Sequence, residues 1–554
     1  MNHWLTILTL VPFLGGIIVA GLGAERKNLA RGFALATSLV ALGGAICMWL
    51  HFDAKSGDLQ FVEKMDWAPT LGIQYFLGVD GLGALMVLLT AIVAPLAILV
   101  SGNLFGVAQT SKSAVSRVSK PADLTNSQRS ADSEIGDTAG LETCATAAGA
   151  PHVYYALVLW LQAGLLGTFT ALNFFHWFLF WELGLIPAFF LVKLWGGPKR
   201  GPAATQFFIY TMFGSVALLL SFLAIRFATG SFDFIELAAM AKSGALTKAL
   251  EAHFAWKSIG LIIFFGVFLG FAVKVPVIPF HTWLPAAYSE APSPVTMLLT
   301  GVMSKMGVYG FLRILLPIFP EQIRAVLTPL LWLAVATVVL STFAAFAQKD
   351  LKRMLAYSSI NHLGYCLLAM FAAASAATTV NAPEIQKAAA LDGCLLQMFN
   401  HGLTASALFL FVALIEKRSG GLRGLEDFGG LRKVVPVFTG LMGIAIFSSL
   451  GLPGLNGFVG EFLIFKGVFP LTPWAAAVAV IGILVTAIFL LTLIQRVFCG
   501  PLNERWAQFP DLTTGERLLV IPSIVLMFVL GVWPQFILGA VDATVMKLVQ
   551  QLTF

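Results

Sequence analysis

Six ionisable residues lie inside strongly apolar segments of the sequence or beside a break in one. They are Glu182, Lys274, Lys305, His362, His401 and Glu461. A charged side chain at the centre of a bilayer costs roughly 2.5–3.5 kcal/mol on insertion scales, so an ionisable group there is functional by default. A desolvated lysine releases its proton more readily, and histidine titrates near neutral pH. The set therefore predicts proton transfer in the plane of a membrane, through these groups and water.

Most of these residues also have a structural interpretation. Glu182 and Lys274 carry opposite charges and could form a buried ion pair that only fixes packing. His362 and His401 could be hydrogen-bonded core histidines or axial ligands of a haem. His281, two turns beyond Lys274 among prolines, fits a helix cap or a secondary relay.

The composition indicates that a membrane surrounds these groups. Of 554 residues, 58% are hydrophobic and 11% charged, and the mean hydropathy is +0.87. An average soluble domain is about 25% charged, and a soluble globule could not bury this apolar excess. The composition excludes a soluble enzyme, a disordered protein and a nucleic-acid-binding protein.

Recognisable cofactor motifs are absent from the sequence. The five cysteines are far apart, no C-x-x-C pair occurs, and neither a Walker A nor a dinucleotide fingerprint is present. We therefore expect no cofactor, metal or nucleotide in this chain.

Fourteen apolar runs approach or exceed the roughly 20 residues that span a bilayer. They are 4–22, 30–51, 80–101, 152–171, 173–194, 203–226, 258–290, 294–316, 326–346, 354–372, 389–415, 435–470, 478–498 and 518–540. The first run has no basic segment before it and no A-x-A cleavage site after it, so we expect a retained helix. The pattern predicts an all-α polytopic membrane protein with about 14 transmembrane helices.

Two runs are too long for one straight helix and contain breaks. Residues 258–290 include three prolines, and residues 435–470 include the glycine-rich stretch 451–457. Both breaks should face the protein interior, where freed backbone groups can be satisfied. The broken runs are the seventh and the twelfth, and each is the fourth of five consecutive runs, 4–8 and 9–13. Because five is an odd number of spans, the two sets must cross the membrane in opposite directions. The pattern therefore predicts two inverted five-helix repeats, each with one discontinuous helix.

These features divide the chain into five parts. We expect helices 1–3 in 1–106, a flexible cytoplasmic insertion in 107–149, the first repeat in 150–320, the second in 321–500, and helix 14 with the C-terminus in 501–554. The insertion is rich in Ser, Thr, Ala, Asp and Gly and has no aromatic residue, so it cannot bury enough apolar area to order itself.

The distribution of Lys and Arg predicts the orientation. With the N-terminus outside, the inner loops hold 21 of these residues and the outer loops hold 8. Positive charge is retained on the cytoplasmic side, so we predict both termini on the periplasmic side of a bacterial inner membrane.

Several motifs resemble the antiporter-like subunits of respiratory complex I. They are Trp181-Glu182, FAVKVPVIPFHTWLP at 271–285, SKMGVYG at 304–310, KRMLAYSSINH at 352–362, and NHGLT at 400–404. The resemblance implies a fourteen-helix fold with two inverted repeats. It also implies a Glu182–Lys274 pair, Lys305 as central relay, His362 and His401 as extensions of the path, and Glu461 as the distal proton site.

Glu461 is informative within this family. A glutamate on the second broken helix is typical of the M (ND4-type) branch, whereas the L branch and the Mrp antiporter subunits tend to carry lysine. The resemblance implies redox chemistry in partner subunits, which would hold the flavin, Fe–S clusters and quinone. It also implies contacts with other membrane-arm subunits, including two further antiporter-like subunits, and with membrane lipid, but not with nucleic acid.

The predicted function is proton translocation as a subunit of an NADH:quinone oxidoreductase. An Mrp-type cation/proton antiporter subunit, or the membrane subunit of a related hydrogenase complex, would carry almost the same motifs. A non-pumping role, holding neighbouring membrane subunits in line, is a third alternative.

Overall fold

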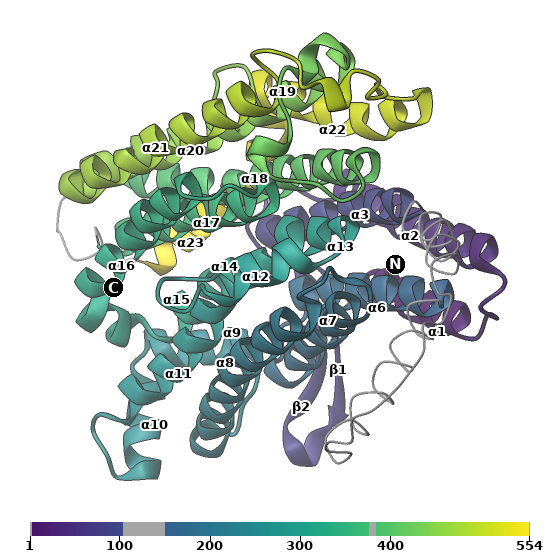
Figure 1. Ribbon diagram of the computed structural model, residues 1–554. Helices are drawn as coiled ribbons and strands as arrows, with labels where there is room; N and C mark the ends of the chain where they lie inside the picture. Colours follow the sequence, from purple (N-terminus) through teal and green to yellow (C-terminus); the bar gives the residue numbers. More distant parts are fainter. Residues whose placement is uncertain (1–2, 103–149, 376–383, 553–554) are drawn as a thin grey trace, which may run out of the picture.

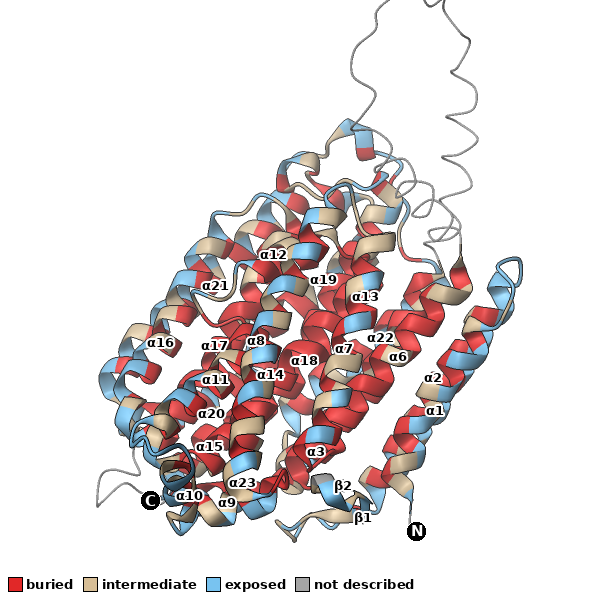
Figure 2. Ribbon diagram, turned by 90° about the horizontal axis from the view of Figure 1, so that it is seen from below, coloured by how far each residue is buried: buried red, intermediate tan, exposed pale blue. Residues whose placement is uncertain are grey.

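A computed structural model describes residues 3–102, 150–375 and 384–552 of the chain (Figure 1). The predicted insertion at 107–149 lies outside these described residues. Long helices lie side by side in a bundle, and their inward faces are buried while the outer helices expose apolar side chains (Figure 2). Outward-facing apolar side chains are what a lipid environment favours.

The helices appear in the order that the hydropathy pattern predicts. In the N-terminal part they are α1 (Trp4–Ala20), α2 (Lys27–Leu50) and α3 (Gly81–Ser101). The next group is α6 (Pro151–Thr170), α7 (Phe174–Trp195), α8 (Arg200–Thr229), α9 (Phe234–Lys242), α10 (Ala245–Phe254), α11 (Ile259–Lys274) and α12 (Trp283–Glu290). A bent element then comprises α13 (Ser293–Leu298), α14 (Ser304–Gly310) and α15 (Leu316–Ile318), with π-helical turns at Leu299–Met303 and Phe311–Leu315.

The C-terminal half continues the same pattern. Its helices are α16 (Pro320–Phe346), α17 (Leu351–Ser375), α18 (Glu384–Ser419), α19 (Pro436–Leu450), α20 (Asn456–Leu471), α21 (Pro473–Val497), α22 (Thr514–Val532) and α23 (Gln535–Gln551). Short 3-10 turns occur at Pro69–Leu71, Leu425–Asp427, Leu431–Lys433 and Glu504–Trp506.

Ten helices of the described part have the length and hydropathy of a membrane span, or eleven if the bent pair α10–α11 is one span. The chain is therefore a multi-pass membrane protein, while the count of fourteen stays a prediction. The last predicted run, 518–540, is wrong as one helix. It breaks at Pro534, because proline lacks an amide donor, and α22 and α23 are separate.

Both predicted interruptions are present. The first separates α11 from α12, and the indole of Trp283 donates to the carbonyl of Val273 at 3.0 Å, so protein satisfies one freed backbone group. The second separates α19 from α20 at Gly451, whose φ is +81°. We predicted that both breaks face the protein interior. This is confirmed for residues 275–277, which are buried, and is wrong for residues 452–454, which are exposed.

One end of the bundle carries a β-hairpin that the all-α prediction lacks. Strand β1 (Gln60–Ala68) pairs antiparallel with β2 (Ile73–Val79), with Asp66 opposite Gln74. Near it, α23 is tied to the loop after α2 by an ion pair between Lys547 and Asp58 at 2.7 Å. Both chain termini lie at this end (Figure 2).

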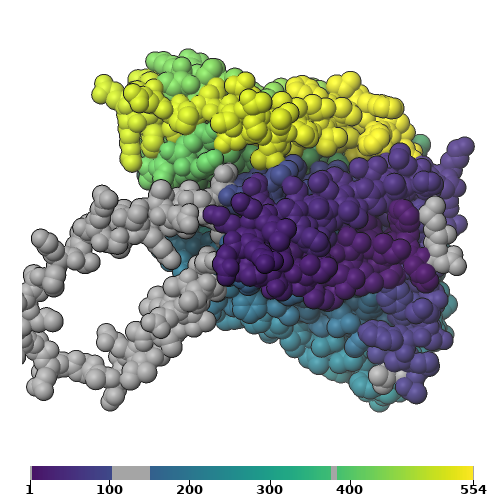
Figure 3. All heavy atoms as spheres, turned by 90° about the vertical axis from the view of Figure 1, so that its right-hand side faces the viewer, coloured from purple at the N-terminus to yellow at the C-terminus, as the bar shows by residue number. Residues whose placement is uncertain are grey.

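The elements that carry the predicted site lie at the centre. The segment Ser293–Ile318 and helices α3, α6 and α18 are buried almost throughout. The N-terminal helices cover one side, between the first group of helices and the C-terminal group (Figure 3). In each five-helix set the broken helix is fourth. The boundaries 150–320 and 321–500, and the inverted relation, stay predictions.

Candidate functional site

Lys305 lies on α14, between two π-helical turns, and its side chain is completely buried. Its ammonium donates to the carbonyl of Thr300 at 2.5 Å and lies 2.7 Å from Nδ1 of His401 on α18. A π turn leaves carbonyls without their usual helical partner, and such turns are frequent at functional sites. Lys305 and His401 can therefore share one proton across this short contact.

Close packing brings α14 and its π turns against their neighbours. A Cβ atom on Gly301 would lie 2.3 Å from Oγ of Ser406, and one on Gly307 would lie 2.5 Å from Val275. Only glycine fits these two contacts, which bring the Lys305 backbone close to both α18 and the first broken helix.

His362 on α17 continues the path from His401. The two imidazole rings are 5.0 Å apart between centroids. Nδ1 of His362 lies 3.1 Å from Oε1 of Glu461 on α20 and 3.2 Å from the amide nitrogen of Gln397. One ring nitrogen cannot donate to Glu461 and accept from Gln397 at once, so its protonation state selects the partner.

Nε2 of His362 is also occupied, since it lies 3.2 Å from the hydroxyl of Ser449. With both ring nitrogens in hydrogen-bond contacts, His362 does not fit the haem-ligand interpretation. The buried groups instead form one set across four helices, in the order Lys305, His401, His362, Glu461.

Glu182 and Lys274 form no salt bridge, although the charge of each acts on the other, so a direct pair stays a prediction. Lys274 is 2% exposed, and its ammonium lies 4.6 Å above the ring of Trp181. That indole donates to Ser215 at 3.0 Å.

Both groups are poorly satisfied by this arrangement. The Lys274 ammonium makes no hydrogen bond to any described residue, and Glu182 interacts with the Ser215 hydroxyl and the Lys274 charge without a hydrogen bond of ordinary geometry. Buried charges are normally paired or hydrated. Glu182 and Lys274 are therefore a second group, separate from the Lys305 set.

His281 is not brought to either group. It is partly buried, and its ring lies 6.2 Å from that of Tyr357. Asp80 caps α3, as an N-terminal carboxylate should, by accepting from the amide of Gly83 at 3.1 Å. It also pairs with Arg313, and both side chains are almost buried.

Sequence reasoning missed three polar residues of the Lys305 set: Thr300, Gln397 and Ser449. Each lies in an apolar run, and Gln397 precedes His401 by four residues, one helical turn. That spacing was a usable signal for Gln397. Nothing comparable marked Ser449, whose partner His362 is 87 residues away.

Comparisons with known proteins agree with this geometry. Residues 171–486 match the family described as NADH:quinone oxidoreductase/Mrp antiporter, TM. The NADH-quinone oxidoreductase subunit M of Mycobacterium tuberculosis (strain ATCC 25618 / H37Rv) is 32% identical over 553 residues, covering 98% of this chain and 94% of that protein. The F(420)H(2) dehydrogenase subunit M of Methanosarcina mazei is 33% identical over 541 residues, covering 96% and 95%.

A solved structure has the same fold. A chain of respiratory complex I from Thermus thermophilus with bound NADH superposes with a TM-score of 0.78 at 24% identity, covering 99% of both chains. The two chains therefore share the same overall fold along almost their whole length.

Proposed function

This chain belongs to the NADH:quinone oxidoreductase/Mrp antiporter family of transmembrane proteins, and from that premise we propose that it translocates protons as a membrane subunit of an NADH:quinone oxidoreductase. The observation that carries the proposal is the buried set from Lys305 through His401 and His362 to Glu461. It places four proton-accepting groups in sequence inside the bundle, where the surrounding apolar residues would otherwise stop an ion.

The proton moves in steps between these groups. Loss of a proton from Lys305 to Nδ1 of His401 leaves a neutral amine and an imidazolium. That imidazolium favours proton release through His362 to Glu461, and Gln397 holds His362 when Glu461 does not. Shifts of a few pKa units, at about 1.36 kcal/mol each, are enough to oppose a membrane potential of about 2.3 kcal/mol per 100 mV.

In this proposal, Glu182 and Lys274 are the groups that respond to a charge change in a neighbouring subunit. A charge change at a neighbouring subunit alters the field at Glu182, and Lys274 responds because its ammonium is buried and without a hydrogen bond among the described residues. The ring of Trp181 supports the charged form of Lys274 by a cation–π contact. Redistribution of charge around Lys274 then favours or opposes proton release from Lys305.

The remaining assignments are part of the same proposal. Redox chemistry takes place in partner subunits, which hold the flavin, Fe–S clusters and quinone, and this chain has no redox centre. Its partners are other membrane-arm subunits, including two further antiporter-like subunits, and lipid. The glutamate at 461 supports the M-type assignment, and the basic loops support a bacterial inner membrane with both termini periplasmic.

Proton pumping in inverted vesicles tests the proposal. Glu461→Gln keeps the shape of the side chain but removes its charge, and NADH oxidation is followed in parallel. We expect both activities to fall while the complex still assembles. Wild-type pumping in Glu461→Gln would contradict the assignment, as would wild-type turnover in Lys274→Ala or Glu182→Ala.

An Mrp-type antiporter subunit is the second candidate, because the matched family includes those proteins. Na⁺-dependent proton exchange in vesicles without any electron donor would favour it. The relative in an F(420)H(2) dehydrogenase makes a different donor possible within the first proposal, and replacing NADH by other donors separates these cases.

A further inference from the structure

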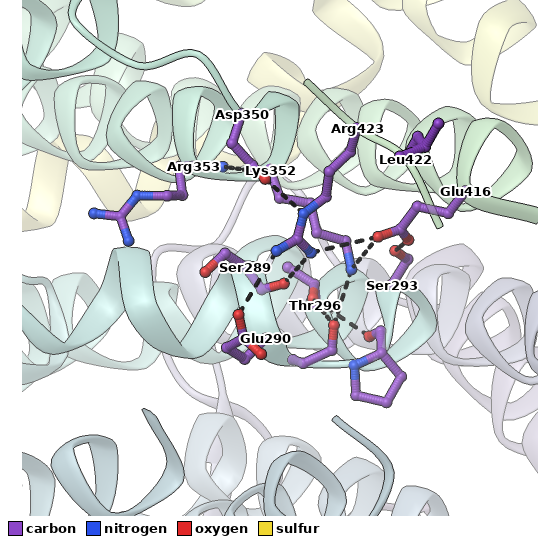
Figure 4. Close-up of polar contacts among 12 residues, drawn as sticks. Ser289, Glu290, Ser293, Thr296, Asp350, Lys352, Arg353, Glu416, Leu422 and Arg423 are labelled. Atoms are coloured by element: carbon purple, nitrogen blue, oxygen red, sulfur yellow. Dashed lines mark hydrogen bonds and ion pairs between the residues drawn. The ribbon is translucent and has the colours of Figure 1, made fainter. Parts of the chain in front are cut away.

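Five charged side chains form a cluster (Figure 4). It involves the ends of α12 and α18, and α12 and α13 lie in the half of the bundle away from the β-hairpin (Figure 2). We call this cluster the Arg423 cluster, and its members are Glu290, Asp350, Lys352, Glu416 and Arg423. They come from the end of α12, the residue before α17 and its first turn, the end of α18, and the loop after α18. The cluster therefore joins the first broken helix to two helices of the second half.

Arg423 is the centre of the cluster. Its Nε lies 2.6 Å from Asp350, and its two terminal nitrogens lie 3.5 Å from Glu416 and 3.6 Å from Glu290. It also donates to the carbonyl of Ser289 at 2.5 Å. Burial opposes the charge, but the carboxylates of Asp350 and Glu416 outweigh it and raise the pKa of Arg423, so the guanidinium stays charged.

Glu416 connects the cluster to the interior. Its Oε1 lies 3.2 Å from the ammonium of Lys352, whose side chain is 3% exposed. Its Oε2 accepts a hydrogen bond of 2.7 Å from Ser293, the first residue of α13. The Glu416 and Asp350 side chains are 21% and 26% exposed, so water reaches the cluster on that side and Lys352 closes it on the other.

The charges in the cluster do not balance. Three carboxylates face two cations, because the guanidinium of Arg353 points away from the cluster and bonds Gln348 at 3.1 Å (Figure 4). The cluster therefore carries one net negative charge at its partly exposed side, and one added proton would make it neutral while both cations keep a carboxylate partner.

A stripe of hydroxyl groups runs from Glu416 to Lys305. Ser293, Thr296, Thr300 and Ser304 are spaced by three, four and four residues, so they share one face of the segment. All four are buried. The stripe starts at the Glu416 hydrogen bond and ends beside Lys305, which bonds the Thr300 carbonyl.

Neighbouring hydroxyls widen this stripe. Thr300 and Ser359 lie 2.9 Å apart between their hydroxyl oxygens, and the hydroxyl of Tyr288 interacts with those of Thr300 and Ser304. The hydroxyls of Thr296 and Ser304 also donate to backbone carbonyls, so the stripe is a continuous polar face between Glu416 and Lys305 with its hydrogens held in place.

We propose that the Arg423 cluster is the proton-loading site for Lys305, and that the hydroxyl stripe from Ser293 to Ser304 is the route between them. This inference rests on the proposed function. Glu416 is the residue that accepts the proton from water, and Lys352 and Arg423 are positioning residues that hold its carboxylate.

The route transfers protons only, and no group on it is oxidised or reduced. One proton moves from water to the Glu416 carboxylate and then onto the stripe. Each hydroxyl, or a bridging water where two hydroxyls are too far apart, accepts one proton and releases another. The last acceptor is the neutral amine of Lys305, whose earlier proton has passed to His401. Glu416 returns to its ionised state.

Two variants of the assembled complex in inverted vesicles test this route. Glu416→Gln removes the acceptor, and Thr300→Val removes a hydroxyl with almost no change of volume. We expect each to reduce proton pumping by about tenfold, less than the roughly 10²–10⁴-fold of general acid–base catalysis because water can replace part of the lost group, and to move the pH optimum of the vesicle medium to lower pH. Glu416→Asp should restore most of the rate. Wild-type pumping with an unshifted pH profile in Glu416→Gln or Thr300→Val would overturn the proposal.

Control variants distinguish failure of the loading site from failure to assemble and from failure of the proposed function. Glu426→Gln removes an exposed glutamate of the same face, 71% exposed and paired with Lys349, and should behave as wild type. If Glu416→Gln fails to assemble, Thr300→Val still decides the question. If Lys305→Met also pumps normally, the proposed function fails. Loss in Lys305→Met alone, with normal Glu416→Gln and Thr300→Val, overturns only the loading site.

Discussion

The ammonium nitrogen of Lys305 lies 2.7 Å from Nδ1 of His401, although 96 positions separate the two residues in the sequence. The contact joins α14 to α18 in the most deeply buried part of the bundle. It converts two isolated ionisable residues into one proton-sharing pair, and it identifies Lys305 as a residue that must lose its proton to act.

Lys305→Arg therefore tests deprotonation directly. Arginine keeps the positive charge but does not release its proton in proteins. We expect coupled turnover to be lost in Lys305→Arg as completely as in Lys305→Met, measured as NADH oxidation and proton uptake by vesicles. Retained turnover in Lys305→Arg would show that only the charge matters.

The two partners of His362 predict a role for Gln397. Gln397→Met keeps the length of the side chain but leaves Glu461 as the sole partner of Nδ1. We expect turnover to fall severalfold with normal assembly, because no side chain then holds Nδ1 of the His362 ring while it is not bonded to Glu461. Gln495→Met, at an exposed position, is the control. Equal rates in both variants would remove Gln397 from the path.

Substitutions of Trp181 should reduce coupled turnover to different extents, depending on whether an aromatic ring remains. The Trp181 ring lies over the Lys274 ammonium, and a desolvated cation–π contact contributes about 2 kcal/mol. Trp181→Phe should keep most of the coupled activity, and Trp181→Leu should lose much more. Measuring turnover against pH separates this effect from packing, because removing the aromatic ring shifts proton release from Lys274 to lower pH. Identical pH profiles for the two variants would contradict the assignment.

The Asp80–Arg313 pair predicts a stability effect independent of transport. Both side chains are almost buried, and removing one partner leaves an uncompensated charge that costs about 3–5 kcal/mol. Asp80→Asn should therefore inactivate at a lower temperature in detergent solution. Combining it with Arg313→Met should recover part of the loss. A double variant less stable than Asp80→Asn alone would show that the pair is not the cause.

The second helix break predicts a site where alanine is not tolerated. A Cβ on Gly457 would lie 1.9 Å from the carbonyl oxygen of Ser448, so Gly457→Ala must displace the start of α20 and with it Glu461. We expect reduced assembly and reduced pumping, seen by native gel and vesicle assay. Gly440→Ala, in α19 with open space at its Cβ, should be neutral or stabilise slightly.

Much of the fold could be predicted from the sequence, and the exceptions have local physical reasons. Pro276 and Gly451 mark the breaks because their backbone chemistry acts wherever they occur. The β-hairpin at 60–79 was missed because it is short and lies between apolar runs. The run 518–540 was predicted as one helix because its hydropathy stays high across Pro534, where the structure has a break between α22 and α23.

For the site, the sequence identified the ionisable residues but not which neighbours their side chains contact. Lys305, His362, His401 and Glu461 were recognised as buried ionisable groups, and the structure brings them together. The contact of the Lys274 ammonium with the ring of Trp181 could not be predicted, because it depends on the rotation of α7 against α11. His281 is in the right segment but the chain turns it towards Tyr357.

The amino-acid order is enough to show that this chain spans a membrane, where its helices break, and which groups can carry a proton. Those properties follow from hydropathy, backbone chemistry and side-chain type, which act locally along the chain. The contact between Lys305 and His401, and the hydroxyl stripe between Glu416 and Lys305, become visible in the folded bundle. Contacts between helices depend on their relative rotation and depth, and packing across the whole bundle sets both.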